Sequence, residues 1–298
     1  TTRPVPTVGH IERIDSFDSQ WVEDRPVDVW LPPGYSAADD RRYPVIYAHD
    51  GQNLFDDDHA FAGTSWEIDR AVDRLASEEG IGPAIVVGIG NTRRRIPEYM
   101  PQRPVARFAR PSVVERFVDT YGSVPLSDRY LTFIVRELKP RIDRAYRTLD
   151  DRRHTFLLGS SMGGLVSVYG ICEFPTYFGG AACLSTSWTL PGRIMTRYLE
   201  YALPAPGTNR FYFDFGDEAL IRRYEGFQNK VNRLLRSAGF ESGVDWLTRR
   251  FPGDPHSESA WRSRVDVPLR FLLEPLSAKR PNVAKGGENA TLYPASDE

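Results

Sequence analysis

The chain has 298 residues, of which 41% are hydrophobic and 26% are charged, and its 38 basic and 40 acidic side chains give a formal net charge of -2. A near-neutral chain without a basic block lacks the clustered positive charge on which binding to nucleic acid or to a membrane surface depends. No apolar run approaches the roughly 20 residues that cross a bilayer. We therefore expect a globular protein with a small-molecule partner, and neither nucleic acid nor membrane.

Neither the start of the chain nor its cysteines fix the compartment. The chain opens with Thr1 and Thr2 and shows no signal peptide, so cytoplasmic and secreted locations both stay open. Cys172 and Cys183 lie in apolar surroundings typical of free thiols, and we expect them to be unpaired. The oligomeric state is not predicted.

Short β-branched runs alternate with longer amphipathic stretches from residue 27 to about residue 275. Strands are predicted at residues 11–14, 27–31, 45–49, 84–90, 155–158, 181–185, 210–215 and 245–251. Helices are predicted at residues 66–77, 127–146, 162–172, 193–201, 220–238 and 259–273. This alternation is typical of an α/β fold, in which a mostly parallel central sheet carries helices on both faces.

Two segments interrupt this order. Residues 93–111 interleave six arginines with four prolines, inside an inserted loop at about residues 91–125. Because that loop leaves the carboxyl end of a predicted strand, where open α/β sheets bind ligands, we expect it to cap a substrate site. Residues 276–298 are polar and aperiodic, which predicts a disordered tail after one domain at residues 1–275.

The strongest chemical signal is a Gly-x-Ser-x-Gly pattern at residues 159–163, between an apolar strand and a helix. A nucleophilic serine needs a strained turn in this setting, and the small residues on either side let the strand and the helix approach closely. Ser161 is therefore the candidate nucleophile, while Ser160 occupies the variable position. The amide of Met162 would point at a developing oxyanion.

A serine nucleophile needs a general base, and only His256 follows Ser161 in the chain among the five histidines. A carboxylate should lie between them, after a strand. The stretch at residues 210–218 offers Asp214, Asp217 and Glu218, and we favour Asp217 with Glu218 as the alternative.

The second oxyanion donor is expected in the loop after the strand at residues 45–49, from the amide of Gln52 or of Gly51. Asp56, Asp57 and Asp58 follow in the same loop. Three consecutive carboxylates cannot all face one ion, so we interpret them as a solvated turn and predict no metal. The proposed chemistry requires no cofactor.

Taken together, the runs VDVWLPPGY, YPVIYAHDGQNLF, GSSMGG, FDFG and PHSESAWRSR resemble the putative esterase family of α/β-hydrolases over about residues 10–275. That family includes feruloyl and acetyl-xylan esterases, siderophore esterases, S-formylglutathione hydrolase and mycolyltransferases. The resemblance implies the α/β-hydrolase fold, Ser161 as nucleophile, His256 as base, and the amides of Gln52 and Met162 as the oxyanion hole.

These residues predict a serine carboxylesterase that works through an acyl-enzyme on Ser161. Trp188, Tyr99 and Phe108 are expected to line the substrate pocket, and with the nearby arginines they would suit a feruloyl, acetyl-sugar or siderophore-type ester. Two alternatives remain open: an acyltransferase that uses the same acyl-enzyme, and a noncatalytic binding protein on the same scaffold.

Overall fold

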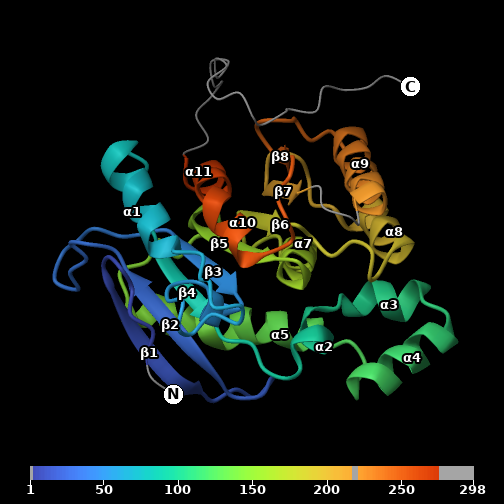
Figure 1. Ribbon diagram of the computed structural model, residues 1–298, viewed down its shortest axis with the longest axis horizontal. Coiled ribbons are helices and arrows are strands. Elements are labelled where there is room, and N and C mark those ends of the chain that lie inside the picture. The colour runs from blue at the N-terminus through green and yellow to red at the C-terminus, as the bar shows by residue number, and fades with distance from the viewer. Residues whose placement is uncertain (1–2, 217–220, 275–298) are drawn as a thin grey trace.

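A computed structural model describes residues 3–216 and 221–274, and the side chains of residues 221–223 are left undescribed. One sheet of eight strands runs through the described chain in the order β1-β2-β4-β3-β5-β6-β7-β8 (Figure 1). The strands are β1 His10–Phe17, β2 Arg25–Leu31, β3 Val45–His49, β4 Ile85–Ile89, β5 Thr155–Ser160, β6 Gly180–Leu184, β7 Arg210–Gly216 and β8 Trp246–Phe251. The β1–β2 and β2–β4 pairs are antiparallel and all other neighbours are parallel, which confirms the predicted mostly parallel sheet.

Helices cover both faces of this sheet (Figure 1). They are α1 Ile68–Glu78, α2 Arg95–Tyr99, α3 Gln102–Phe108, α4 Pro111–Tyr121, α5 Ser127–Phe133, α6 Lys139–Ala145, α7 Met162–Glu173, α8 Arg193–Ala202, α9 Ile221–Ser237, α10 Glu258–Arg264 and α11 Asp266–Leu273. Alternate residues of a strand face opposite sides, so Val45 and Tyr47 of β3 join one apolar core while Ile46 and Ala48 join the other. Burial on both faces explains why the central strands are continuously apolar.

Two predicted helices are interrupted in the structure. A π-helical segment, Ile134–Leu138, separates α5 from α6. The last predicted helix divides at Val265, which ends α10 and precedes α11. Pro268 then occupies the first turn of α11, where its missing N–H removes no helical hydrogen bond.

Residues 91–125, which we call the cap segment, contain three helices where the sequence predicts a loop. The prolines that suggested a loop mark helix beginnings instead, because the first turn of a helix tolerates a residue without an N–H. Pro97 lies in the first turn of α2, Pro104 in that of α3, and Pro111 is the first residue of α4. The cap segment is anchored through α2, which packs against α5 and α7, and through α3, which packs against α8.

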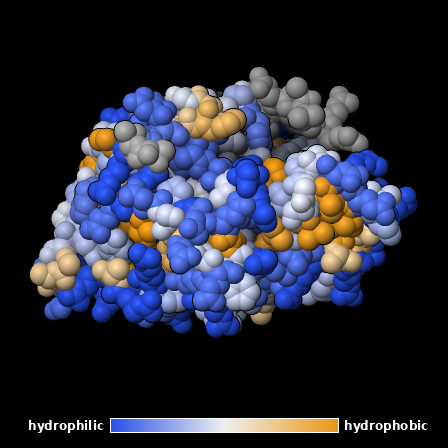
Figure 2. Space-filling view, turned by 90° about the horizontal axis from the view of Figure 1, so that it is seen from below, coloured by the Kyte–Doolittle hydropathy of each residue, from blue (hydrophilic) through white to orange (hydrophobic). Residues whose placement is uncertain are grey.

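Helix α4 is the outermost part of the cap segment and has no buried residue. Apolar surface gathers toward the right of the face in Figure 2, in the region of α3 and α4. Val113 there is 45% exposed and Tyr121 38%. No helix among the described residues is both long and apolar enough to span a membrane.

Candidate active site

The turn between β5 and α7 holds Ser161 in a conformation that L-residues rarely adopt, with φ at 56° and ψ at −117°. A Cβ added to Gly159 would lie 2.7 Å from the carbonyl carbon of Gly163, which confirms that the pattern allows close approach of strand and helix. Ser161 N–H donates to the carbonyl of Leu184 at 2.8 Å. The turn is therefore held to β6, with the half-buried Ser161 directly ahead of the N-terminus of α7.

Ser187 contacts the candidate nucleophile twice, and sequence reasoning missed it. Its hydroxyl oxygen lies 2.9 Å from that of Ser161, and its N–H donates to the carbonyl of Ser161 at 3.0 Å. It follows β6 in the run STSW, at the carboxyl edge of the sheet. That position was the only signal in the sequence, since every parallel strand ends at this edge.

The loop after β3 brings Gln52 to the same edge of the sheet. Asp50 adopts φ 56°, and a short 3-10 helix, Gly51–Asn53, begins after it. A Cβ on Gly51 would lie 2.5 Å from the carbonyl carbon of Gly88, so glycine at this position lets the loop pack closely against β4. Among the hydrogen bonds of the described residues, the amides of Gln52 and Met162 donate to no protein acceptor.

An ion pair fixes the strained Asp50. Arg95 of α2 donates from Nε to one carboxylate oxygen at 2.7 Å and from Nη2 to the other at 2.8 Å. Asn91 donates to the same carboxylate at 2.6 Å, and the Asp50 N–H donates to the Tyr99 hydroxyl at 3.3 Å. A Cβ on Gly163 would come 3.6 Å from this carboxylate, so the cap segment is tied directly to the turn beside Ser161.

His256 lies on the loop between β8 and α10, with its ring standing edge-on to Trp261 at 5.0 Å between centroids. Within the described chain, no hydrogen bond joins it to Ser161. Trp261 connects the two regions, because its indole N–H donates at 3.1 Å to Ser185, two residues before Ser187. Desolvation, reinforced by the positive charges of Arg264 and Arg95, lowers the pKa of His256, which favours the neutral imidazole that a base requires.

Arg264 connects strand β7 with the loops that follow β6 and β8, and it was not predicted. Its guanidinium donates to the fully buried carboxylate of Asp214 at 3.1 and 3.2 Å, to Asp254 at 2.7 Å and to the Ser185 hydroxyl at 3.0 Å. Asp214 also accepts from the amide of Ser185 at 3.0 Å and from Tyr212. The Asp214 carboxylate is thus fully engaged in holding loops together.

The favoured acid Asp217 and its alternative Glu218 lie outside the described residues. Their predecessor Gly216, the last residue of β7, packs against the loop that carries His256. A Cβ on Gly216 would overlap the backbone of Asp254 at 2.0 Å from its carbonyl oxygen. Glycine at this position therefore allows β7 to end against the histidine loop.

Two of the three expected pocket residues lie in the core instead. Trp188 and Tyr99 are both 0% exposed, and the Trp188 indole N–H donates to Gln228 at 2.9 Å. The free energy gained by burying these large rings, with their polar atoms hydrogen-bonded, favours the core over an exposed position at a pocket wall. Phe108 alone is half-buried, with the guanidinium of Arg197 4.4 Å from its ring centroid.

The remaining histidines and the acidic turn have protein partners. The His49 ring bonds to Tyr130 at 2.8 Å, and burial lowers the pKa of His49 to about 4. Each of the other three lies near a carboxylate: His10 near Glu12, His59 near Asp56, and His154 near Asp151. Asp57 binds Ser65 and Arg262. The described residues hold no group of three or more His, Cys, Asp or Glu side chains that could bind a metal ion. Cys172 and Cys183 are free thiols, which agrees with the expectation that they are unpaired.

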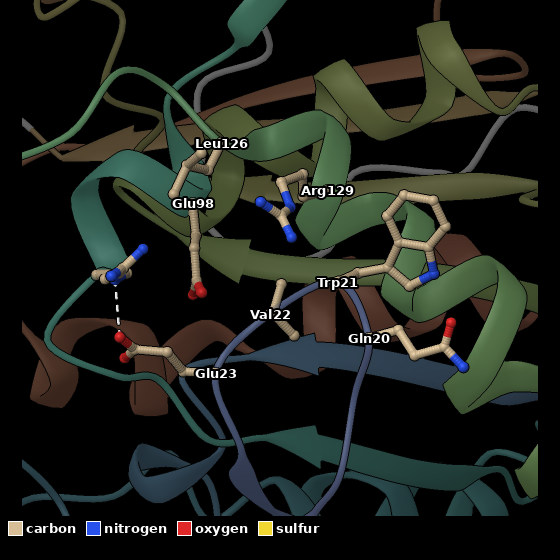
Figure 3. Close-up of a pocket in the computed structure, with 8 residues that line it drawn as sticks. Gln20, Trp21, Val22, Glu23, Glu98, Leu126 and Arg129 are labelled. Carbon is tan, nitrogen blue, oxygen red and sulfur yellow. Dashed lines mark ion pairs between the residues drawn. The ribbon is translucent and has the colours of Figure 1, made fainter.

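A cavity of about 230 Å³ lies beside α2 (Figure 3). Arg94, which directly precedes α2, and Glu98 of α2 line it together with Trp21 and Arg129. Arg94 pairs there with Glu23 at 2.8 Å, and Glu98 with the buried Arg25 at 2.6 Å. Neither Ser161 nor His256 borders this cavity.

Comparison with curated proteins identifies two bacterial relatives. YbbA of Bacillus subtilis is 26% identical over 218 residues, which cover 71% of this chain and 78% of that protein. The ferri-bacillibactin esterase BesA of Bacillus subtilis is 29% identical over 167 residues, or 50% of each chain. The chain therefore spans about half the length of BesA.

Solved structures share the fold at low sequence identity. An IroE-like serine hydrolase from Shewanella oneidensis superposes with a TM-score of 0.64 at 20% identity, covering 88% of this chain and 80% of that one. A ferulic acid esterase superposes with a TM-score of 0.61 at 19% identity, covering 89% and 98% respectively. These likenesses establish the α/β-hydrolase fold. The model of the family described as "Putative esterase" matches residues 19–270, and the chain belongs to that esterase family.

Proposed function

We propose that this protein is a serine carboxylesterase that forms an acyl-enzyme on Ser161. The observation that carries the proposal is the conformation of Ser161 itself. A serine held at φ 56° between β5 and α7 is strained, and strain of this kind concentrates where a side chain must be presented to a ligand. The adjacent Met162 amide opens α7 without a protein acceptor among the described residues, so it is available to an oxyanion.

The second oxyanion donor in this proposal is the amide of Gln52. Asp50 and Gly51 direct it, the first through its positive φ and the second through its packing on β4. Two backbone donors that need not reorganise stabilise a tetrahedral intermediate well, and loss of one such donor typically costs roughly 100- to 1,000-fold in rate. The fixed loop geometry is therefore the main catalytic contribution that we assign to this region.

His256 acts in the proposal as general base and then as general acid. It accepts the proton of the Ser161 hydroxyl as that oxygen attacks the ester carbonyl, and it returns the proton to the leaving alkoxide. Water then repeats the sequence and releases the acid. Asp217, with Glu218 as alternative, would orient the imidazole, and the packing of Gly216 against the histidine loop supports this placement.

The assay is hydrolysis of a short p-nitrophenyl ester. Ser161→Ala should abolish turnover and labelling by a fluorophosphonate probe. Ser160→Ala, at the buried neighbouring position, is the matched control and should keep both. Wild-type turnover in Ser161→Ala would refute the proposal, as would failure of the probe to label Ser161 in folded wild-type protein.

For the substrate we propose an ester with an aromatic acid, of the feruloyl or siderophore type. Phe108 and the arginines around it supply an aromatic and cationic surface on the cap segment. BesA and the ferulic acid esterase carry such substrates in their names. A feruloyl ester should turn over faster than an acetyl ester with the same alcohol, and equal kcat/KM values would remove this assignment.

A further inference from the structure

An open recess of about 540 Å³ lies between helices α8 and α9 and borders neither Ser161 nor His256. It is lined by Arg193, Arg197, Gly226, Phe227 and Lys230. Arg193 and Arg197 are four residues apart on α8, and Gly226 and Lys230 are four apart on α9, so each pair lies on one helix face. A Cβ on Gly226 would meet nothing within 4 Å, so the space above this residue is open.

The recess concentrates positive charge that the described residues neutralise only at Lys230. Among the described residues, no carboxylate pairs with Arg193 or Arg197, and both side chains are exposed. Lys230 lies 3.9 Å from Glu200, whose side chain is itself 50% exposed. Three cations therefore border this recess in a chain whose net charge is -2, and within the described residues Glu200 is the one carboxylate paired with any of them.

Some exposed arginines elsewhere in the protein have a carboxylate partner. Arg94 pairs with Glu23 at 2.8 Å, Arg103 with Glu173 at 2.7 Å, and Arg270 with Glu79. Other exposed arginines, such as Arg233 and Arg236 of α9, also have no carboxylate partner within the described residues, so Arg193 and Arg197 differ from them in bordering a recess. Absence of that partner in a concave site is the pattern expected where the anion comes from a ligand.

An apolar ring completes the recess. Phe227 is half-buried and lies 3.9 Å from the position of a Cβ on Gly192, in the loop that leads from Ser187 to α8. The volume is in the range of sites for small organic molecules. Arginine offers planar, two-pronged hydrogen bonding to carboxylate and phosphate groups, while the Phe227 ring offers a surface to a flat apolar body.

We propose that this recess binds a small organic polyanion, with two or more carboxylate or phosphate groups on a ring-sized apolar frame. Arg197 also stacks on Phe108, so a ligand bound in the recess would contact a residue that packs on the cap segment. The binding claim rests on the recess alone and not on the proposed esterase activity. The same chemistry would suit a free polyanion or the charged end of an ester substrate.

Calorimetric titration of the full chain with benzene-1,3,5-tricarboxylate tests the proposal. We expect saturable binding that weakens as salt is raised, and weaker binding of the neutral benzene-1,3,5-tricarboxamide. Arg193→Gln with Arg197→Gln should lower the affinity by about tenfold or more. The control is Arg233→Gln with Arg236→Gln, which removes the same charge from exposed positions of α9 outside the recess. Unchanged affinity in the recess variant, equal loss in the control, or no binding to wild type would overturn the proposal.

Two further arms identify the source of the anion. Ser161→Ala should bind the tricarboxylate like wild type, so failure of the esterase assignment leaves this result intact. In the wild type, the tricarboxylate should raise KM for an ester with an anionic acyl group if the recess holds part of the substrate. A change in kcat for a neutral ester, with its KM unchanged, would instead identify a free effector.

Discussion

Removal of the Arg95 guanidinium should impair the proposed oxyanion loop although Arg95 contacts no reacting atom in our scheme. In Arg95→Gln, the Asp50 carboxylate loses two charge-assisted hydrogen bonds and keeps only Asn91 from the cap segment. Asp50 is 6% exposed and Arg95 28%. Loss of one partner from a buried pair costs about 3–5 kcal/mol, and the partial exposure of Arg95 places this case near about 3 kcal/mol.

If the loop bears the whole cost, kcat/KM falls by roughly 100-fold, because each 1.36 kcal/mol or so corresponds to a factor of ten. Relaxation of the loop would reduce this to about tenfold. Asp50→Asn in the Arg95→Gln background should add little further loss, because the two residues act as one unit. Hydrolysis of a p-nitrophenyl ester by single and double variants measures the coupling.

The pH profile separates this mechanism from simple loss of packing. Arg95 is one of the positive charges that lower the pKa of His256. Its removal raises that pKa, so the acid limb of the kcat/KM profile should move to higher pH. Arg94→Gln is the matched control, since Arg94 is the preceding residue and pairs with Glu23 instead. An unmoved acid limb in Arg95→Gln, or a shift of equal size in Arg94→Gln, would refute the reasoning.

Three other substitutions test separate parts of the structure. Ser187→Ala removes the hydroxyl 2.9 Å from that of Ser161, and we expect kcat/KM to fall by about three- to tenfold, the value of one neutral hydrogen bond; an unchanged rate would make the contact incidental. Gly51→Ala forces a Cβ against Gly88, and a thermal melt should show a lowered Tm together with lost activity, whereas a wild-type melt would contradict the packing argument. Burial raises the pKa of Asp28 to about 6, above its unfolded value, so this group makes the protein less stable as pH rises from about 4 to about 6. The free energy of unfolding of Asp28→Asn relative to that of wild type should therefore be higher at pH 8 than at pH 4, by up to about 3 kcal/mol in urea unfolding. A difference between the two proteins that does not change with pH would exclude this explanation.

Local sequence pattern predicted the parts of the fold that local physics determines. The strand at Val45–His49 is found at its predicted bounds, because a short apolar run can be buried on both faces only as a central strand. The Ser161 turn could be predicted as well, because the close packing of its strand against its helix requires glycines within a few residues of Ser161. The local pattern was misleading in the cap segment, because the prolines at 97, 104 and 111 are compatible both with a loop and with the first turn of a helix.

Contacts between distant residues could not be predicted in this way. Arg264 meets Asp214 across 50 residues of chain, and nothing in either local run selects that partner among 40 acidic side chains. The direction in which the Trp188 side chain points could not be predicted from its local sequence either. It follows a strand at the ligand-binding edge, yet its ring packs on Phe213 and its N–H finds Gln228, so core burial decides its position.

The distribution of strained backbone gives an independent reason to place function at this edge of the sheet. Four non-glycine residues in the described chain have positive φ, and three of them, Asp50, Ser161 and Ser185, follow directly after β3, β5 and β6. Such conformations cost about 1–3 kcal/mol each and persist only where other contacts enforce them. Arg95 holds Asp50, and the Asp214 carboxylate accepts the amide of Ser185. Contacts that only stabilise the fold do not require strain at three neighbouring strand ends. A site that directs backbone amides and a hydroxyl toward one point does require it.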